Sequence, residues 1–211
     1  MHPWFKPKQY VATLRDVDPV ALRDLGIHAV LLDLDNTLVA WRGSELQPDM
    51  EAWVRRALDA NLKICIVSNT WRRSRIHAIA EKLGIPYILR AGKPRRGSLR
   101  RAMETLVSVP EETAVIGDQI FTDIMGGNRI GAYTILCAPM PGREFFGTGV
   151  VRQFERFLMR RLADQGHLVL PGRPAAEQEM GEERTIREAQ EEVQEDRETR
   201  KTCKKTEQGS K

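Results

Sequence analysis

The chain has 211 residues, which is long enough for one domain with a sizeable hydrophobic core. Its formal net charge of +4 favours an anionic partner without identifying it, since nucleic acid, acidic lipid and small phosphates all qualify. Three cysteines are too few for a disulfide scaffold, so we expect a reducing, cytoplasmic location. No apolar run approaches the roughly 18 residues of a membrane-spanning helix, and no secretion signal is predicted at the N-terminus.

Strand-like and helix-like segments alternate from residue 29 to residue 136. Apolar runs predict strands at 29–33, 63–67, 86–89, 113–116 and 133–136, and helical spacing predicts helices at 49–60, 72–83, 97–107 and 119–129. Such alternation produces parallel strands joined by right-handed crossovers. We therefore expect an α/β fold of three layers, with a Rossmann-like central parallel sheet. Ligands of such sheets bind at the carboxyl ends of the strands.

The first predicted strand ends in two acidic residues. Asp33 and Asp35 are spaced i, i+2, so both side chains point to the same side of an extended segment. Two carboxylates beside a buried strand are unfavourable unless a cation or hydrogen bonds compensate them. A Mg²⁺ ion that keeps room for waters and a phosphate would explain the pair. The pattern alone is weakly specific, because turns and calcium-binding loops often contain it.

The next three predicted strands also end in polar side chains. Ser68 and Asn69 follow the second, Lys93 lies in a loop after the third, and Asp118 and Asp123 follow the fourth. Carboxyl ends of parallel strands meet at one edge, so these groups are expected to lie near the first acid pair. Together they supply a nucleophile, a proton donor, a hydroxyl and a cation for phosphate oxygens, and acids for a metal. This set favours phosphoryl transfer to an aspartate.

In this order and spacing the segments resemble the haloacid dehalogenase (HAD) superfamily of phosphatases. They are most similar to the YqeG-type subgroup of class IIIA, which includes mitochondrial phosphatidylglycerophosphate phosphatases. The resemblance covers roughly residues 1–170 and rests on four segments, namely Asp33 to Val39, Ser68-Asn69, Lys93-Pro94, and Gly117 through Arg129 to Leu136. It implies a HAD fold and a phosphoric monoester hydrolase.

The resemblance also implies a role for each matching residue. Asp33 would be the nucleophile that forms an aspartyl-phosphate, and Asp35 would protonate the leaving oxygen and then activate water. The Mg²⁺ ligands would be Asp33, the backbone carbonyl of Asp35, Asp118 and, directly or through water, Asp123. The phosphate-binding groups would be the hydroxyls of Thr37 and Ser68, the backbone N–H of Asn69 and the ammonium of Lys93.

Short connections predict an enzyme without a cap domain. Leu38 to Asp49 leaves room only for a small flap, and Ser68 to Lys93 is filled by one helix and one strand. An open site suits phosphates on a lipid or a macromolecule. Arginines near the predicted mouth favour an anionic substrate larger than its phosphate, with the strongest expectation at Arg72, Arg73, Arg95 and Arg96, and with Arg75 and Arg90 nearby.

Three functional interpretations follow. The first is hydrolysis of phosphatidylglycerophosphate to phosphatidylglycerol, with peripheral attachment at the inner membrane surface. The second is a soluble phosphatase for a nucleotide, a sugar phosphate or a nucleic-acid end. The third is a protein that binds RNA or an assembly factor and has secondary phosphatase activity, which is disfavoured because no RNA-binding motif is present. The oligomeric state is not predicted.

The two ends of the chain differ in composition from the predicted sheet. The segment 4–10 mixes aromatics with lysines and is expected either to cover a sheet edge or to anchor at a membrane interface. Residues 150–163 predict an amphipathic helix that docks on the sheet or lies on a membrane. Residues 171–211 are rich in Glu, Arg, Lys and Gln, so we expect a phosphatase domain at 1–170 and a charged, disordered tail at 171–211.

Overall fold

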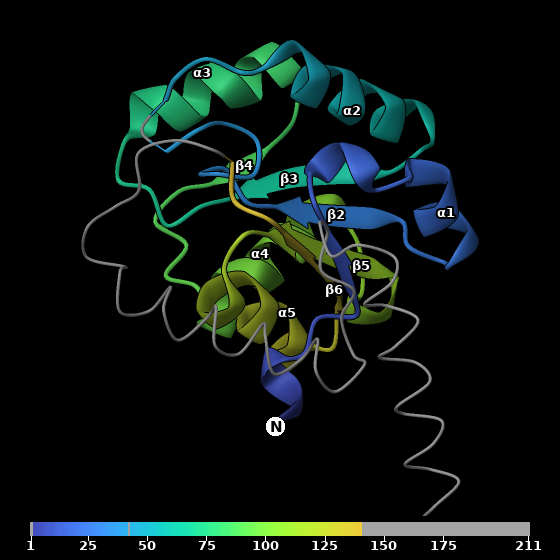
Figure 1. Ribbon diagram of the computed structural model, residues 1–211. Coiled ribbons are helices and arrows are strands. Elements are labelled where there is room, and N and C mark those ends of the chain that lie inside the picture. Colours follow the sequence, from blue (N-terminus) through green and yellow to red (C-terminus); the bar gives the residue numbers. More distant parts are fainter. Residues whose placement is uncertain (1, 42, 141–211) are drawn as a thin grey trace, which may run out of the picture. The chain divides into compact units, whose positions relative to one another are not determined.

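The computed structural model of the chain describes residues 2–41 and 43–140 (Figure 1). The helix expected at 150–163, the tail expected from residue 171 and the domain boundary between them all lie outside the described residues. None of the helices in the described ranges is long and apolar enough to cross a lipid bilayer.

Six parallel strands form the central sheet. They are β1 (Gln9–Val11), β2 (Ala29–Leu32), β3 (Lys63–Val67), β4 (Tyr87–Ile88), β5 (Thr113–Gly117) and β6 (Tyr133–Cys137), in the order β1-β6-β5-β2-β3-β4. Every neighbouring pair is parallel, so the expected α/β fold with a Rossmann-like sheet is confirmed. The chain continues from β2 to β3 on one side, while β5 lies on the other. The carboxyl end of β2 is therefore the switch point at which such sheets bind ligands.

The edge strand β1 is not visible in the sequence pattern, because three residues are too few to show an alternation of apolar and polar side chains. Gln9 pairs with Ile135 and Val11 with Cys137 of β6. Residues 9–11 therefore cover the edge of the sheet, one of the two roles expected of the N-terminal segment.

Helices cover both faces of the sheet, as predicted (Figure 1). On one face lie α1 (Pro19–Asp24), α2 (Pro48–Asp59) and α3 (Arg73–Leu83), and on the other α4 (Arg96–Leu106) and α5 (Met125–Ile130). Along β2, Val30 belongs to the same apolar cluster as Trp53 of α2, whereas Leu31 belongs to the cluster of Leu99 of α4. Alternate strand side chains thus face opposite helical layers.

The helix expected at 119–129 has two parts in the structure. A π-helical turn, η4 (Ile120–Ile124), leads directly into α5. Gly127 lets α5 lie close to the sheet, since a Cβ at this position would be 2.6 Å from Cγ2 of Thr134 and 3.0 Å from Cβ of Val115. A side chain at position 127 would therefore push the helix away from β5 and β6.

Candidate active site

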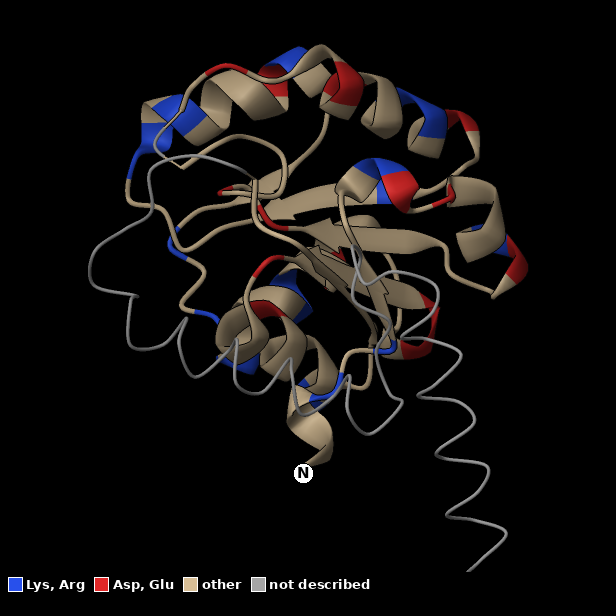
Figure 2. Cartoon of the chain, viewed as in Figure 1, with Lys and Arg blue, Asp and Glu red and all other residues tan. Residues whose placement is uncertain are grey.

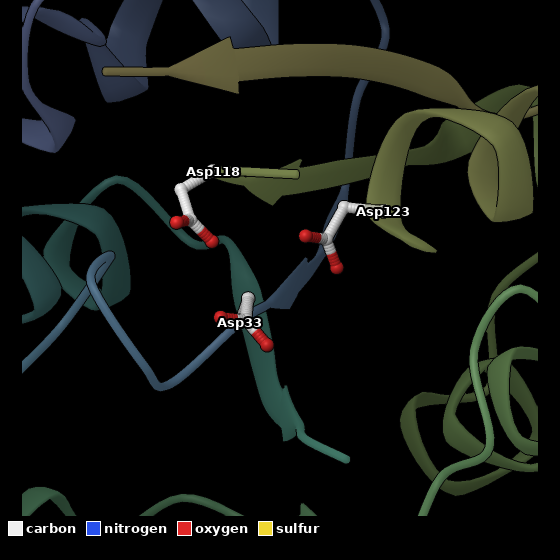
Figure 3. A group of neighbouring side chains, drawn as sticks. All are labelled: Asp33, Asp118 and Asp123. Carbon is white, nitrogen blue, oxygen red and sulfur yellow. The ribbon is translucent and has the colours of Figure 1, made fainter. Parts of the chain in front are cut away.

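Three buried carboxylates meet at the carboxyl edge of the sheet. Asp33 directly follows β2, Asp118 directly follows β5, and Asp123 lies in η4. Each offers one oxygen atom to a group whose members all lie within 4.8 Å of one another. Figure 3 shows the three side chains converging from these segments. The backbone N–H of Asp33 donates to the carbonyl of Ile116 at 2.9 Å, which ties the end of β2 to β5.

Lys93 joins two of these carboxylates. Its Nζ lies 2.6 Å from Oδ1 of Asp33 and 2.6 Å from Oδ1 of Asp123, and all three side chains are buried. Burial raises the pKa of Asp33 to about 7, although the Lys93 ammonium acts in the opposite direction. Burial alone would lower the pKa of Lys93, but the carboxylates of Asp123 and Asp33 outweigh it and raise that pKa. Lys93 therefore remains an ammonium.

The three acidic residues could bind a metal ion. Carboxylate oxygens are the donors that hard divalent cations prefer. One ammonium leaves three converging carboxylates with an excess of negative charge. A divalent cation fits this donor set and would compensate the excess.

Asn69 positions the loop that carries Lys93. Its side-chain amide donates to the backbone carbonyl of Lys93 at 3.2 Å, and its Oδ1 accepts the backbone N–H of Lys93 at 2.8 Å. The backbone N–H of Ala91 also donates to the carbonyl of Ser68, at 3.0 Å. The Asn69 side chain therefore holds the lysine loop. The phosphate contact that we expect from Asn69 involves its backbone N–H, which these two hydrogen bonds do not use.

Asp123 is held by its own segment. Its Oδ2 accepts hydrogen bonds at 3.2 Å from the backbone N–H of Gln119 and at 3.2 Å from the hydroxyl of Thr122. The carboxylate occupies the space that a Cβ at Gly117 would fill. Because Gly117 has no side chain, the carboxylate of Asp123 can reach the site beside Asp118. Any larger residue at position 117 would clash with this carboxylate.

Two hydroxyl groups lie buried in the loops beside the acids. Oγ of Ser68 accepts the backbone N–H of Thr70 at 3.1 Å. Oγ1 of Thr37 is buried and has no hydrogen-bond partner within the described residues. A buried hydroxyl without a partner is unfavourable, and an oxygen atom of a bound ligand would satisfy it.

Asp35 does not belong to the acid cluster and pairs with Arg75. Nη1 of Arg75 lies 2.6 Å from Oδ1 of Asp35, and both side chains are largely buried. The same guanidinium donates from Nη2 to the carbonyl of Ala40 at 3.2 Å and from Nε to the carbonyl of Gly43. Arg75 thus connects α3 to Asp35 and to the flap that follows it. From the sequence we expected Arg75 near the other arginines at the mouth of the site. That prediction is wrong, because Arg75, in the first turn of α3, faces the flap.

The other arginines expected at the mouth are exposed. Arg72 and Arg95 are the residues at which α3 and α4 begin, and Arg73 and Arg96 are the first residues of those helices. Neither helix has an acidic residue in its first turn or a side-chain hydrogen bond at its N-cap. Figure 2 shows positive segments at this edge of the molecule.

The comparisons with known proteins agree with this geometry. The family described as mitochondrial PGP phosphatase matches residues 2–139. The chain belongs to this family. The probable phosphatase YqeG of Bacillus subtilis is 36% identical over 165 residues, which cover 78% of this chain and 95% of that protein. A mitochondrial phosphatidylglycerophosphatase of Saccharomyces cerevisiae is 32% identical, over 62% of this chain and 76% of that protein.

A solved structure of the cobalt-bound deoxy-D-mannose-octulosonate 8-phosphate phosphatase from Haemophilus influenzae also matches this PGP phosphatase family member. It is 16% identical, with a TM-score of 0.44 over 57% of this chain and 71% of that chain. The family assignment confirms the expected group of YqeG-type and phosphatidylglycerophosphate phosphatases and the expected enzyme class, a phosphoric monoester hydrolase.

Two residues of this phosphatase that contact its acidic groups are not apparent from the sequence. Arg75 is one, since its sequence neighbourhood resembles that of Arg72 and Arg73. Asn36 is the other: its backbone is left-handed at φ +61°, its amide donates to Oδ2 of Asp118 at 3.3 Å, and its Oδ1 accepts the N–H of Trp41 at 3.1 Å. Asparagine tolerates the left-handed region better than most residues, and a tight turn at this position could have been inferred from that preference.

Proposed function

We propose that this phosphatase depends on Mg²⁺ and works through an aspartyl-phosphate formed at Asp33. The observation that carries the proposal is the 2.6 Å contact between the buried Asp33 carboxylate and the Lys93 ammonium, beside Asp118 and Asp123. A carboxylate held by an ammonium at the end of a central strand is a positioned nucleophile. The same ammonium can neutralise charge on the phosphoryl group while it transfers.

The reaction has two halves. In the first, an oxygen of Asp33 attacks phosphorus, the bond from phosphorus to the leaving oxygen breaks, and Asp35 gives its proton to that oxygen. In the second, Asp35 takes a proton from water, and the water oxygen attacks phosphorus. Inorganic phosphate leaves, and the Asp33 carboxylate is regenerated. The ion pair with Arg75 positions the ionised Asp35 carboxylate, the form that acts as base in the second half; the same group must take up a proton before it can act as acid in the first half.

Binding groups for phosphate and metal come from the surrounding loops. The hydroxyls of Thr37 and Ser68, the backbone N–H of Asn69 and the ammonium of Lys93 would bind phosphate oxygens. The ligands of Mg²⁺ would be the carboxylates of Asp33 and Asp118 and the backbone carbonyl of Asp35. Asp123 would contribute directly or through water, and both its oxygens also accept hydrogen bonds. When bound, Mg²⁺ reduces the repulsion between the nucleophile and the phosphate.

The substrate that we propose is phosphatidylglycerophosphate, which would be hydrolysed to phosphatidylglycerol. The name of the yeast relative supports it, and so do the exposed arginines Arg72, Arg73, Arg95 and Arg96 beside the site. The connections from β2 to α2 and from β3 to β4 contain no additional domain in the residues described, so a bulky substrate meets no cap there. We also propose a cytoplasmic location with peripheral attachment to the membrane.

Phosphate release from a substrate panel tests this function. The purified full-length chain would be given phosphatidylglycerophosphate in neutral detergent micelles, nucleotides, sugar phosphates and polynucleotides with terminal phosphates, each with Mg²⁺ and with EDTA. We expect Mg²⁺-dependent release that is fastest from the lipid. Faster release from a water-soluble phosphate would favour the second interpretation, and salt-sensitive RNA binding without turnover would favour the third.

A further inference from the structure

Trp71 is an exposed aromatic residue beside the active site. It lies between β3 and α3, and 73% of its surface is accessible, compared with 43% for Trp4. The guanidinium of Arg90 lies 4.3 Å from the centre of its ring. A cation–π contact at an exposed site contributes only about 0.5–1 kcal/mol. This contact and the slight burial do little for folding, so the indole is available for a partner outside the described domain.

The two segments that carry Trp71 and Arg90 are rich in positive charge. Neither 69–80 nor 89–103 contains Asp or Glu. From the exposed residues of these two segments we define the basic rim as Trp71, Arg72, Arg73, Arg90, Arg95 and Arg96. Within the described residues, none of its arginines forms an ion pair, in contrast to the buried Arg75 and Lys93. Arginines at helix N-termini also oppose the helix dipole, so folding alone does not favour this arrangement.

Backbone contacts place both parts of the rim at one edge. The N–H of Arg90 donates to the carbonyl of Thr70 at 3.3 Å, and Asn69 holds the backbone of Lys93. The loops that carry Trp71 and Arg95 therefore follow neighbouring strands, β3 and β4, at the edge where the acid cluster lies. In Figure 2 the positive segments before α3 and before α4 lie along this edge of the cartoon.

We propose that the basic rim docks on an anionic lipid bilayer, with Trp71 at the level of the headgroups. An indole combines an apolar ring with an N–H donor and suits the membrane–water interface. Arginines near an anionic surface each add to the attraction and bind lipid phosphates. A single-stranded nucleic acid fits less well, because it uses successive aromatic platforms and the rim segments contain one aromatic residue. The inference rests on the proposed lipid substrate, whose phosphate would then face Asp33.

Vesicle binding of the full-length chain tests the docking. Phosphatidylcholine vesicles with and without phosphatidylglycerol would be pelleted with wild type, Trp71→Ala, and the double variant Arg72→Glu with Arg73→Glu. Each basic residue near such a surface contributes a factor of about five, so the double variant should bind anionic vesicles at least about twentyfold more weakly. Trp71→Ala should weaken binding several-fold. Added salt should weaken wild-type binding in the same direction.

Matched controls separate the rim from charge and aromaticity in general. Arg55→Glu with Arg56→Glu makes the same change of charge at two exposed positions of α2, and Trp4→Ala removes a tryptophan that contacts Arg129 of α5. Both should bind vesicles nearly as well as wild type. Equal losses in rim and control variants would overturn the proposal, as would failure of the wild type to bind anionic vesicles. Loss only in Trp4→Ala would also overturn it, by assigning docking to the N-terminal segment.

Two activity measurements test the docking surface and the proposed substrate separately. Turnover of an aryl phosphate should be unchanged in Trp71→Ala, which shows that the site is intact. Turnover of phosphatidylglycerophosphate in neutral detergent micelles tests the substrate without a charged surface. Vesicle binding without lipid turnover in micelles would reject the substrate and retain the docking surface. Rim-dependent binding to single-stranded RNA, with no binding to vesicles, would reject the bilayer as partner.

Discussion

Arg75 and Asp35 form a buried ion pair with 2.6 Å between Nη1 and Oδ1, in a chain whose other arginines near the site are exposed. The guanidinium also donates hydrogen bonds to two backbone carbonyls of the flap, those of Ala40 and Gly43. One side chain on α3 therefore fixes both the proposed general acid and the flap that follows it. A planar group with several N–H donors can do this, whereas an ammonium on a flexible stem cannot hold three acceptors in the same way.

Arg75→Lys should impair protonation of the leaving group more than the attack on phosphorus. General acid catalysis contributes about 10²–10⁴-fold. We expect kcat/KM for an alkyl phosphate, which needs a proton on its leaving oxygen, to fall about 100-fold. For an aryl phosphate with a good leaving group the fall should be less than about tenfold. The measurement is kcat/KM across phosphate esters whose leaving groups differ in pKa.

Arg55→Lys is the matched control, because Arg55 is exposed and pairs with Glu51 on α2. Its kcat/KM should be unchanged on all esters, since surface ion pairs contribute little. If Arg75→Lys lost the same factor on every ester, the contact with Asp35 would be structural only. The melting temperature should be measured together with activity. It should fall in Arg75→Lys, because the lysine ammonium cannot reach all three acceptors that the guanidinium contacts and leaves some of them unpaired.

Much of the fold follows from periodicity in the sequence. The predicted strands near β2, β3, β5 and β6 and the helices near α2, α3 and α4 agree with the structure within one residue at each end. Buried strands and amphipathic helices of this length repeat their apolar positions often enough to be recognised. β1 and α1 have three and six residues, too few for a repeat to appear.

The sequence predicts the location of those site residues that follow the ends of the predicted strands. Strand ends bring Asp33, Lys93 and Asp118 to one edge, and the structure places them near one another together with Asp123. Their catalytic roles remain predictions. The contact of Arg75 with Asp35 and that of Asn36 with Asp118 depend on how separate segments pack, and no local pattern encodes that packing.

Asp33→Asn should abolish turnover while the fold survives. The amide is isosteric and can still accept a hydrogen bond from Lys93, but it cannot attack phosphorus as a carboxylate does. We expect phosphate release to fall by about 10³-fold or more. Far-ultraviolet circular dichroism would show that the fold is retained, and Asp59→Asn, at an exposed position of α2, would serve as the control. Substantial residual turnover would contradict a covalent mechanism at Asp33.

Gly127→Ala should destabilise the domain. The new methyl group would meet Cγ2 of Thr134 at 2.6 Å and Cβ of Val115 at 3.0 Å, so α5 must shift. Overpacking of this kind typically costs about 1–3 kcal/mol, which chemical denaturation would measure. Gly97→Ala on α4 is the matched control, since a Cβ there meets nothing within 4 Å. It should leave stability unchanged or raise it by up to ~1 kcal/mol. Equal stability in both variants would contradict the close packing of α5.

Asp118→Asn and Asp35→Asn should respond differently to Mg²⁺. Asp118 would supply a carboxylate ligand, whereas Asp35 would supply only its backbone carbonyl, so the first substitution should remove most of the stabilisation by Mg²⁺ and the second should retain it. For the wild type, a metal concentration 100-fold above Kd would stabilise by about 2.7 kcal/mol. Asp35→Asn should instead lower the melting temperature with or without metal, because it leaves the buried Arg75 without its anionic partner. Thermal unfolding in EDTA and across a Mg²⁺ titration measures both effects.

Equal loss of the Mg²⁺ response in the two variants would mean that the Asp35 side chain itself binds the ion. A full response in Asp118→Asn would remove Asp118 from the metal site.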